Sequence, residues 1–210
     1  MISDLFQQAI GATANTISEN AALLNELDAA VGDGDHGSNL SRGFLAVAAQ
    51  TEELASLDMG EALQRAGMTL VTTVGGAAGP LYGTLLMSMG KAAPCGALLQ
   101  VQDIAFMLDQ GVAAVKQRGR SDVGEKTMLD VLGPVGEAFH RAIAEGARGS
   151  EVAAKLVAAA EAGVEATRNM EATKGRAAQL GERSIGHPDP GAMASYLLVK
   201  ALCDRFTDQA

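Results

Sequence analysis

Apolar residues recur along this chain at helical spacing, and the segments that carry them are separated by breaks rich in glycine and proline. Close to the N-terminus, positions three or four residues apart form one apolar stripe: Phe6, Ile10, Thr13, Ile17 and Leu24. Such a stripe predicts an amphipathic helix with that face in the core. Similar patterns predict eight helices, at about 2–29, 38–53, 58–74, 80–91, 100–118, 126–146, 149–172 and 190–208. Alternating strand patterns are absent from the sequence, so we predict an all-α fold.

The predicted connections indicate how these helices are arranged. Short links favour antiparallel neighbours, so we expect an eight-helix up-and-down bundle or barrel, formed as a single domain by residues 1–210. Four links hold the glycines, the prolines and many polar residues, and they follow the first, third, fifth and seventh helices: 29–38, 75–80, 118–126 and 173–191. In an up-and-down arrangement these four links share one end of the bundle. A single site at that end could use all of them.

Composition supports this picture and excludes several classes of function. Apolar residues make up 48% of the chain and aromatic residues 3%, with no tryptophan, which is typical of closely packed helices. The net charge of −9 argues against nucleic-acid or anionic-membrane binding. Residues 66–90 carry no charge, but the turn at 75–80 divides them into two buried helices. Without an export signal, and with Cys95 and Cys203 expected as reduced thiols, a cytoplasmic location is predicted.

The most informative motif is an acidic, glycine-rich segment at the end of the first predicted helix. Asp28 comes four residues after Leu24, so it lies on the apolar face, where a carboxylate is costly unless it meets a positive charge. Asp33 and Asp35 follow in a glycine-rich loop and can converge with it. Three converging carboxylates suit Mg²⁺, which completes its shell with water and phosphate oxygens. The alternative is an ordinary turn in which Asp35 or Ser38 caps the next helix.

Three familiar motifs can be set aside. Residues 32–37 match G-x-G-x-x-G, but a helix rather than a strand precedes them, and two carboxylates would repel a pyrophosphate. The same loop begins like an EF-hand, yet its twelfth position is Phe44 instead of glutamate. Residues 119–127 resemble a P-loop, but Glu125 stands between the glycine and the lysine. A Rossmann domain, a calcium sensor and a Walker A site are therefore not predicted.

The other three links also carry candidate binding residues. Residues 75–80 are small and precede a helix whose first residue is predicted to be Pro80, so free amides could bind phosphate; close helix packing is the alternative. Met128 could lie against a purine ring or simply fill the core. In the long 173–191 link, Arg176 suits a phosphate, whereas a solvated arginine is the alternative. Asp189 and Pro190 read first as the cap and first residue of the last helix.

Taken together, these segments resemble the nucleotide-binding L subunit of dihydroxyacetone kinase, which is also the C-terminal domain of single-chain ATP-dependent dihydroxyacetone kinases. The matching segments follow the family order through much of the chain: Gly32–Asn39, Gly79–Gly83, Gly119–Asp122, Thr173–Arg176, Gly181–His187 and Asp189–Ala192. Two departures concern side-chain contacts. Ala78 stands where the family commonly has serine, and Ala178-Gln179 stands where Ser-Tyr often follows the arginine that corresponds to Arg176.

The resemblance implies an eight-helix barrel that holds ADP or ATP through two Mg²⁺ ions at one end. The implied metal ligands are Asp28, Asp33 and Asp35, which form the catalytic set together with Arg176. The implied nucleotide contacts come from all four links: His36, Gly37, Ser38, Asn39, Ala77, Ala78, Gly119, Met128, Arg176, Asp189, Pro190 and Gly191.

The resemblance also implies partners. In size the chain is similar to the free-standing subunit of the phosphotransferase-dependent enzyme, in which a separate K subunit holds dihydroxyacetone and a phosphohistidine-carrying M subunit recharges the bound ADP. The expected activity is phosphoryl transfer in which the protein supplies position and charge neutralisation. Two alternatives stay open: a nucleotide-sensing module that acts on a regulatory partner, and a kinase subunit that uses exchangeable ATP on another small ketose or polyol. Assembly into a homo-oligomer is also left open.

Overall fold

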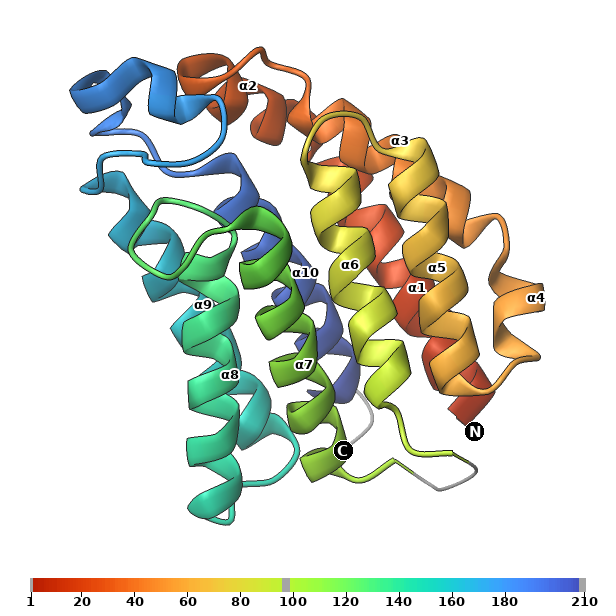
Figure 1. Cartoon of the computed structure of the whole chain (residues 1–210). Coiled ribbons are helices and arrows are strands. Elements are labelled where there is room, and N and C mark those ends of the chain that lie inside the picture. Colours follow the sequence, from red (N-terminus) through yellow and green to blue (C-terminus); the bar gives the residue numbers. More distant parts are fainter. Residues whose placement is uncertain (1, 96–98, 208–210) are drawn as a thin grey trace.

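The computed structural model describes residues 2–95 and 99–207. Within these two ranges the fold consists of helices joined by turns and loops (Figure 1). The regular elements are ten α-helices and one 3₁₀ helix: α1 (Ile2–Glu19), α2 (Ala21–Val31), α3 (His36–Ala48), α4 (Thr51–Ala55), α5 (Met59–Thr73), α6 (Ala78–Ala92), α7 (Val101–Gly119), α8 (Leu129–Ala144), α9 (Ser150–Arg168), η1 (Ala177–Ser184) and α10 (Pro190–Thr207). The all-α prediction is confirmed. The predicted count of eight is wrong for the described residues, and position 208 of the last predicted helix lies outside them.

The longer helices pack in a closed succession of neighbours. From α5 to α10, each helix contacts the next one along the chain. Helix α10 then contacts α1, α1 contacts α3, and α3 contacts α5. This succession agrees with short links between neighbouring helices, whereas the exact barrel geometry stays a prediction.

The first predicted helix is divided at Asn20. The backbone of Asn20 leaves helical geometry, at φ −101° and ψ 10°, and its side-chain amide donates to the Thr16 carbonyl at 2.8 Å. Asparagine competes in this way for backbone hydrogen bonds and so interrupts helices. The second part, α2, carries Asp28 in its last turn, so the break helps to set the direction of the acidic loop.

Other boundaries differ for local reasons. The predicted helix 38–53 separates into α3 and the short α4, and α9 ends at Arg168 rather than near 172. Helix α6 begins at Ala78, so Pro80 lies inside its first turn, where the missing N–H costs no hydrogen bond. The 173–191 link is not plain loop, because it contains η1, which is kinked at Gly181.

Two buried clusters hold the helices together. One cluster joins the N-terminal helices to α5–α8 and includes Leu24, Leu40, Leu70 and Leu129. The other lies mainly between α8 and α9, and Met193 and Tyr196 of α10 pack against both. Each fully buried leucine contributes about 1.5–3 kcal/mol. The helix ends that carry the four polar links are therefore fixed by core packing.

The links converge at one end of the molecule, at the top of Figure 1, while both chain ends lie toward the bottom. Here α2, η1, the turn before α6, the loop between α7 and α8, and the start of α10 come together. This convergence was predicted from the alternation of the links. None of the helices in the described part of the chain has the length and apolar character needed to cross a membrane.

Candidate functional site

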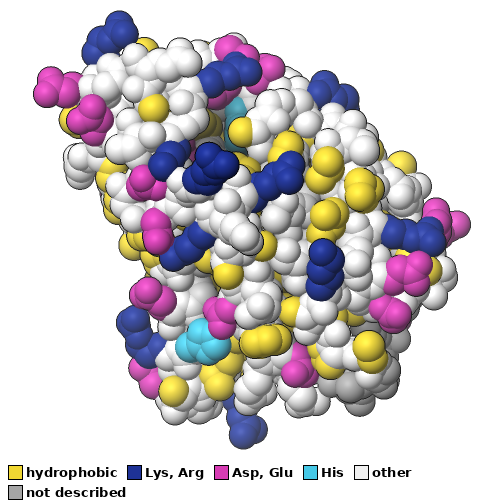
Figure 2. All heavy atoms as spheres, in the orientation of Figure 1, with side chains coloured by type: hydrophobic (Ala, Val, Ile, Leu, Met, Phe, Trp, Pro, Cys, Tyr) yellow, Lys and Arg dark blue, Asp and Glu magenta, His cyan; other side chains and the backbone are white. Residues whose placement is uncertain are grey.

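The converging links enclose a cavity of about 480 Å³, which lies within the size range of small-molecule sites. Thirteen of the predicted binding residues line it: Asp28, Asp33, Asp35, His36, Asn39, Ala77, Ala78, Gly119, Met128, Arg176, Asp189, Pro190 and Gly191. Lysine and arginine side chains gather on the face that contains the hollow (Figure 2). All four links contribute to the lining, as the sequence predicted.

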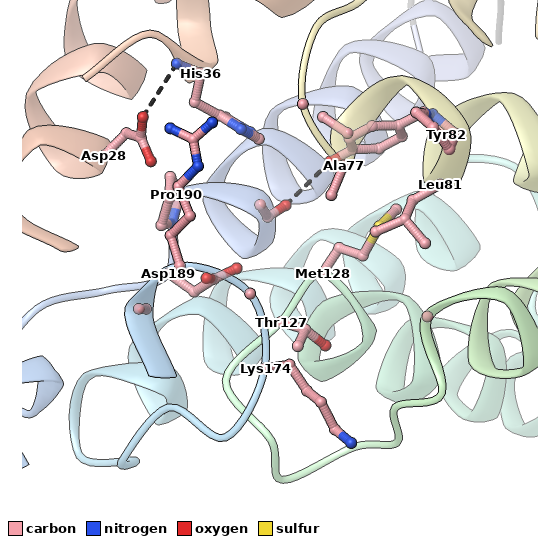
Figure 3. Close-up of a pocket in the computed structure, with 18 of the residues that line it drawn as sticks. Asp28, His36, Ala77, Leu81, Tyr82, Thr127, Met128, Lys174, Asp189 and Pro190 are labelled. Carbon is pink, nitrogen blue, oxygen red and sulfur yellow. Dashed lines mark hydrogen bonds between the residues drawn. The ribbon is translucent and has the colours of Figure 1, made fainter. Parts of the chain in front are cut away.

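The acidic loop forms one wall of the cavity. Asp28 is buried, and its Oδ2 accepts a hydrogen bond from the Asp35 amide at 3.0 Å. It also accepts one from the His36 amide at 3.3 Å (Figure 3). Gly34 has a φ of +78°, a conformation that glycine adopts easily and that lets the chain turn back onto α2. One oxygen from each of Asp28, Asp33 and Asp35 lies within 4.8 Å of the others. This donor set fits a hard divalent cation.

His36 follows directly at the start of α3. Its ring points into the cavity, and burial lowers the pKa of the imidazole, although the Asp28 and Asp35 carboxylates act in the opposite direction. Among the described residues, its Nε2 is a buried side-chain polar atom without a hydrogen-bond partner. A buried polar atom of this kind is costly unless a ligand or water satisfies it. The site is therefore built to receive a polar group beside the carboxylates.

The turn between α5 and α6 forms a second wall. Gly75, Gly76, Ala77 and Ala78 line the cavity, and α6 begins at Ala78. The backbone amides in the first turn of a helix have no intrahelical acceptor, and the helix dipole makes that end attractive to anions. The absence of larger side chains leaves this backbone open to the cavity. The turn therefore has the open backbone that a phosphate site needs, and phosphate binding here stays a prediction.

An apolar surface continues from this turn. Leu81, Val115 and Met128 line the cavity together with Tyr82. The Tyr82 hydroxyl donates to the Gly191 carbonyl at 3.1 Å and shares a hydrogen bond of 2.9 Å with Ser195. Burial raises the pKa of Tyr82, so the phenol stays protonated. The surface suits the flat apolar face of a nucleobase, and Tyr82 joins α6 to the start of α10.

The 173–189 segment lies across from the acidic loop. Lys174 and Arg176 line the cavity, and the Arg176 guanidinium forms an ion pair with Asp33. Ala177 packs with Val31 of α2 and with Ala172 in a small buried cluster, which seats the segment on α2. The positive charge of Arg176 is thereby held beside the three carboxylates.

Asp189 joins this segment to α10. Its Oδ2 accepts a hydrogen bond from the Ala192 amide at 2.7 Å, and its own amide donates to the Thr167 hydroxyl at 2.9 Å. The predicted helix cap is therefore present. Burial raises the pKa of the Asp189 carboxyl to about 7, and the nearby Asp130 carboxylate adds to the effect, while the Ala192 amide opposes it.

Asp189 gives a prediction for stability against pH. Because its pKa rises from 3.8 to about 7 on folding, the folded state holds a proton that the unfolded state loses above pH 4. The contribution is present below pH 4 and is lost as the pH rises to about 7. At about 1.4 kcal/mol per pKa unit, Asp189→Asn should remove a pH dependence of a few kcal/mol. Urea unfolding of the wild type and of Asp189→Asn, without metal, at pH 5 and pH 7.5 measures the free energy of unfolding. The same change with pH in both proteins would contradict the prediction.

The DAK2 domain model matches residues 30–204. This chain belongs to the DAK2 domain family. Among curated relatives, it is 41% identical over 186 residues to the ADP-binding subunit DhaL of a PEP-dependent dihydroxyacetone kinase from Listeria innocua, covering 89% of this chain and 88% of that protein. It is 37% identical over 185 residues to the DhaL subunit from Escherichia coli, covering 88% of each.

A solved structure supports the same assignment for the DAK2 domain. The dihydroxyacetone kinase of C. freundii, in complex with AMP-PNP and Mg²⁺, aligns with a TM-score of 0.73 and 27% sequence identity. The alignment covers 96% of this chain and 34% of the larger protein. The chain therefore spans about a third of the length of that kinase chain. Its curated relatives include phosphotransferases, among them the triokinase/FMN cyclase of Mus musculus, at 36% identity.

Two predicted contacts lie apart from the cavity of this DAK2 domain. Gly37 is buried where α3 meets the backbone of Ala21, so it serves helix packing. The Ser38 amide and hydroxyl both bond to the Asn25 side chain, at 3.0 Å and 2.7 Å. Neither lines the cavity, and their role in nucleotide binding stays a prediction.

Several lining residues were not singled out from the sequence as nucleotide contacts. Lys174, two residues before Arg176, could have been found from its place in the same link. Tyr82 and Val115 gave no such signal, because a buried residue on an apolar helix face is normally core. Lys126 was expected as the first residue of the predicted helix 126–146, and its burial could not be foreseen from the sequence.

Proposed function

We propose that this chain is the nucleotide-binding subunit of a dihydroxyacetone kinase. In this proposal, residues 1–210 form one cytoplasmic domain that binds ADP or ATP and passes a phosphoryl group to dihydroxyacetone held on a separate K subunit. A phosphohistidine-carrying M subunit then recharges the ADP in place. The main support is that Asp28, Asp33 and Asp35 converge within 4.8 Å on a cavity that also contains the start of α6. The relatives named as ADP-binding subunits give independent support.

In this proposal Asp28, Asp33 and Asp35 would hold two Mg²⁺ ions beside the nucleotide phosphates. Bound Mg²⁺ would neutralise phosphate charge and orient the transferred group. The three carboxylates fit this role because they offer hard oxygen ligands and because Asp28 is already oriented by two backbone amides. The C. freundii kinase, crystallised with AMP-PNP and Mg²⁺, supports the same pairing of nucleotide and metal.

The nucleotide is placed across the cavity by the remaining lining residues. Amides near Ala77 and Ala78, with His36 and Asn39, would contact phosphates. Leu81 and Met128 would contact the base, close to Gly119. We further assign Gly37 and Ser38 to the phosphate side, and the turn before α10 to the ribose and base side, through Asp189, Pro190 and Gly191.

The chain contributes charge and position to the transfer, with no covalent intermediate on the protein. The bond between the terminal phosphorus and its bridging oxygen breaks and leaves ADP. A hydroxyl oxygen of dihydroxyacetone forms the new bond to phosphorus, and its proton passes to a base that the K subunit would supply. Arg176 carries a positive charge next to the phosphates, and the amides before α6 stabilise charge that develops on the bridging oxygen. Closing the 173–189 segment over the site would exclude water.

A coupled assay tests the proposal. Phosphate should reach dihydroxyacetone only when this chain is combined with a K subunit and either ATP or a phosphohistidine M subunit with its donor. Retention of ADP through purification would favour recharging by the M subunit, while turnover with added ATP alone would favour exchangeable nucleotide. Nucleotide binding without phosphoryl transfer in any combination would favour the nucleotide-sensing alternative.

Nucleotide should also stabilise the fold. If Mg²⁺–ADP binds only the folded state, a concentration of about 100 times its dissociation constant adds roughly 2.7 kcal/mol, which raises the melting temperature by about 5–10 °C. EDTA should remove this gain, because the carboxylates and the diphosphate repel each other without metal. Thermal melts of stripped protein with Mg²⁺ alone, ADP with EDTA, and ADP with Mg²⁺ measure the effect. A shift that survives EDTA would contradict the metal-dependent site.

A further inference from the structure

Lys126 is the clearest buried charge that the proposed chemistry leaves without a role. Only 1% of its surface is exposed, although it lies in the loop before α8 and lines the cavity. Its ammonium donates hydrogen bonds to three backbone carbonyls: Thr167 at 2.5 Å, Met170 at 3.1 Å and His187 at 2.6 Å. An ammonium has three donors, so these carbonyls account for all of them.

The three carbonyls lie at the two places where the 173–189 segment joins the rest of the chain, after α9 and before α10. Thr167 lies in the last turn of α9 and Met170 just beyond it, where the chain departs toward Lys174 and Arg176. His187 lies where the chain returns to α10. Helix C-termini present carbonyls without intrahelical donors, and a cation there is favourable. A single side chain thus connects the part of the chain that follows α9 to the part that precedes α10.

The backbone around Lys126 is also held in place. The Asp130 carboxylate on α8 accepts hydrogen bonds from the amides of Gly124 at 2.5 Å and Thr127 at 2.7 Å, which holds the loop on both sides of Lys126. The backbone of Lys126 is left-handed, at φ +60°, which is uncommon for a residue other than glycine. Such strain persists only where the surroundings impose it, and here it places the side chain inside the protein.

Uncharged and exposed contacts also hold the segment. The Asp189 amide donates to the Thr167 hydroxyl and the Ala172 amide to the Ser184 hydroxyl, both at 2.9 Å and both buried. Glu125 pairs with Lys174 at 3.4 Å on the surface. Arg168 donates to the Gly186 carbonyl at 3.2 Å, and the Gly186 amide donates to the Arg168 carbonyl at 2.8 Å. Exposed charged pairs contribute little, whereas hydrogen bonds from a buried charge are stronger and leave unsatisfied groups when broken. Lys126 therefore supplies a buried, charged link that contacts both ends of the segment.

We propose that Lys126 is a positioning residue: its buried ammonium joins the two ends of the 173–189 segment to the loop before α8 and so holds Arg176 beside the three carboxylates. Arg176 pairs with Asp33, and the next residue, Ala177, packs on Val31 of α2. Separation of the two ends of the segment would loosen the packing of Ala177 on α2. The kinetic part of the inference rests on the proposed kinase activity, while the structural part does not.

Hydrogen exchange tests the structural part without nucleotide or substrate. In Lys126→Met, amides in residues 169–189 should exchange at least about tenfold faster than in the wild type, while those of α5 and α6 keep their rates. The matched control is Lys155→Met. It removes a half-exposed lysine of α9 that pairs with Glu145, at the end of α8, and with Glu151. Unchanged exchange at 169–189 in Lys126→Met would overturn the proposal, whatever the activity of the protein.

Kinetics with the K subunit and ATP tests the positioning part. Lys126→Met should lower kcat about tenfold or more and change the dissociation constant of Mg²⁺–ADP by less than about threefold. If Lys126 acts through Arg176, the double variant with Arg176→Ala should be no slower than Arg176→Ala alone. Losses that multiply in the double variant would show independent roles and overturn the proposal.

A second variant covers the case in which Lys126→Met does not fold, as judged by circular dichroism. Lys126→Gln keeps a side chain that can donate two hydrogen bonds but carries no charge. It should show the same localised increase in exchange, with a smaller amplitude. Uniformly faster exchange over the whole chain in this variant would show a general structural role and overturn the proposal. If exchange confirms the tie but no phosphoryl transfer is seen even in the wild type, the proposed function fails and the structural inference stands.

Discussion

Asp33→Ala and Asp35→Ala proteins are expected to lose Mg²⁺-dependent binding of ADP while keeping their helical fold. Both carboxylates are exposed at the cavity, so their removal costs little stability. Removing a partner that only orients a metal ligand typically costs 10–100-fold in metal affinity. Loss of a ligand itself should weaken Mg²⁺–ADP binding by about 100-fold or more, or roughly 2.7 kcal/mol. Isothermal titration of stripped protein measures the change.

The control for this experiment is Glu26→Ala, which removes an exposed carboxylate from the same helix, α2, outside the cavity. It should bind Mg²⁺–ADP like the wild type. Asp28→Ala is a poorer test, because the buried Asp28 carboxylate also orients the amides of Asp35 and His36. Wild-type affinity in Asp33→Ala and Asp35→Ala would rule out the metal site.

Arg176→Ala is expected to slow phosphoryl transfer far more than it weakens ADP binding. The carboxylates and the amides before α6 would still hold the diphosphate, while a positive charge next to the transferred group is lost. Arginines that stabilise transferring phosphoryl groups contribute factors of 10³–10⁵ elsewhere, so we expect kcat to fall by about 100-fold or more. The dissociation constant of Mg²⁺–ADP should change by less than about tenfold. Turnover with the K subunit, together with titration, separates the two effects.

Arg183→Ala provides the matched control, because Arg183 is an exposed arginine in η1 that does not line the cavity. Its activity should match the wild type. Limited proteolysis gives an independent measurement, since Mg²⁺–ADP should slow cleavage within residues 173–189 by drawing Arg176 onto the phosphates. An Arg176→Ala protein of normal activity, with cleavage unaffected by nucleotide, would show that the segment is only a connection.

Local chemistry explains which parts of the fold could be predicted. Apolar residues at helical spacing and breaks at glycine and proline indicated an all-helical chain, because these features act within a few residues. The interruption at Asn20 was missed, since a single asparagine is tolerated in many helices and only its bond to the Thr16 carbonyl shows the break. The 3₁₀ helix η1 was also missed. It is held in place by packing between Ala177 and Val31, which are far apart in the sequence.

The candidate site was predictable where one short segment carries several reactive groups. Asp28, Asp33 and Asp35 are close in the chain, so their spacing alone indicated convergence, and the alternation of links placed four loops at one end of the bundle. What only the tertiary structure decided is how distant residues meet: Arg176 pairs with Asp33, Tyr82 bonds to Gly191, and the Lys126 ammonium binds three carbonyls. Packing of α2, α8, α9 and α10 fixes these contacts, and pairings across such long separations leave no pattern in local spacing.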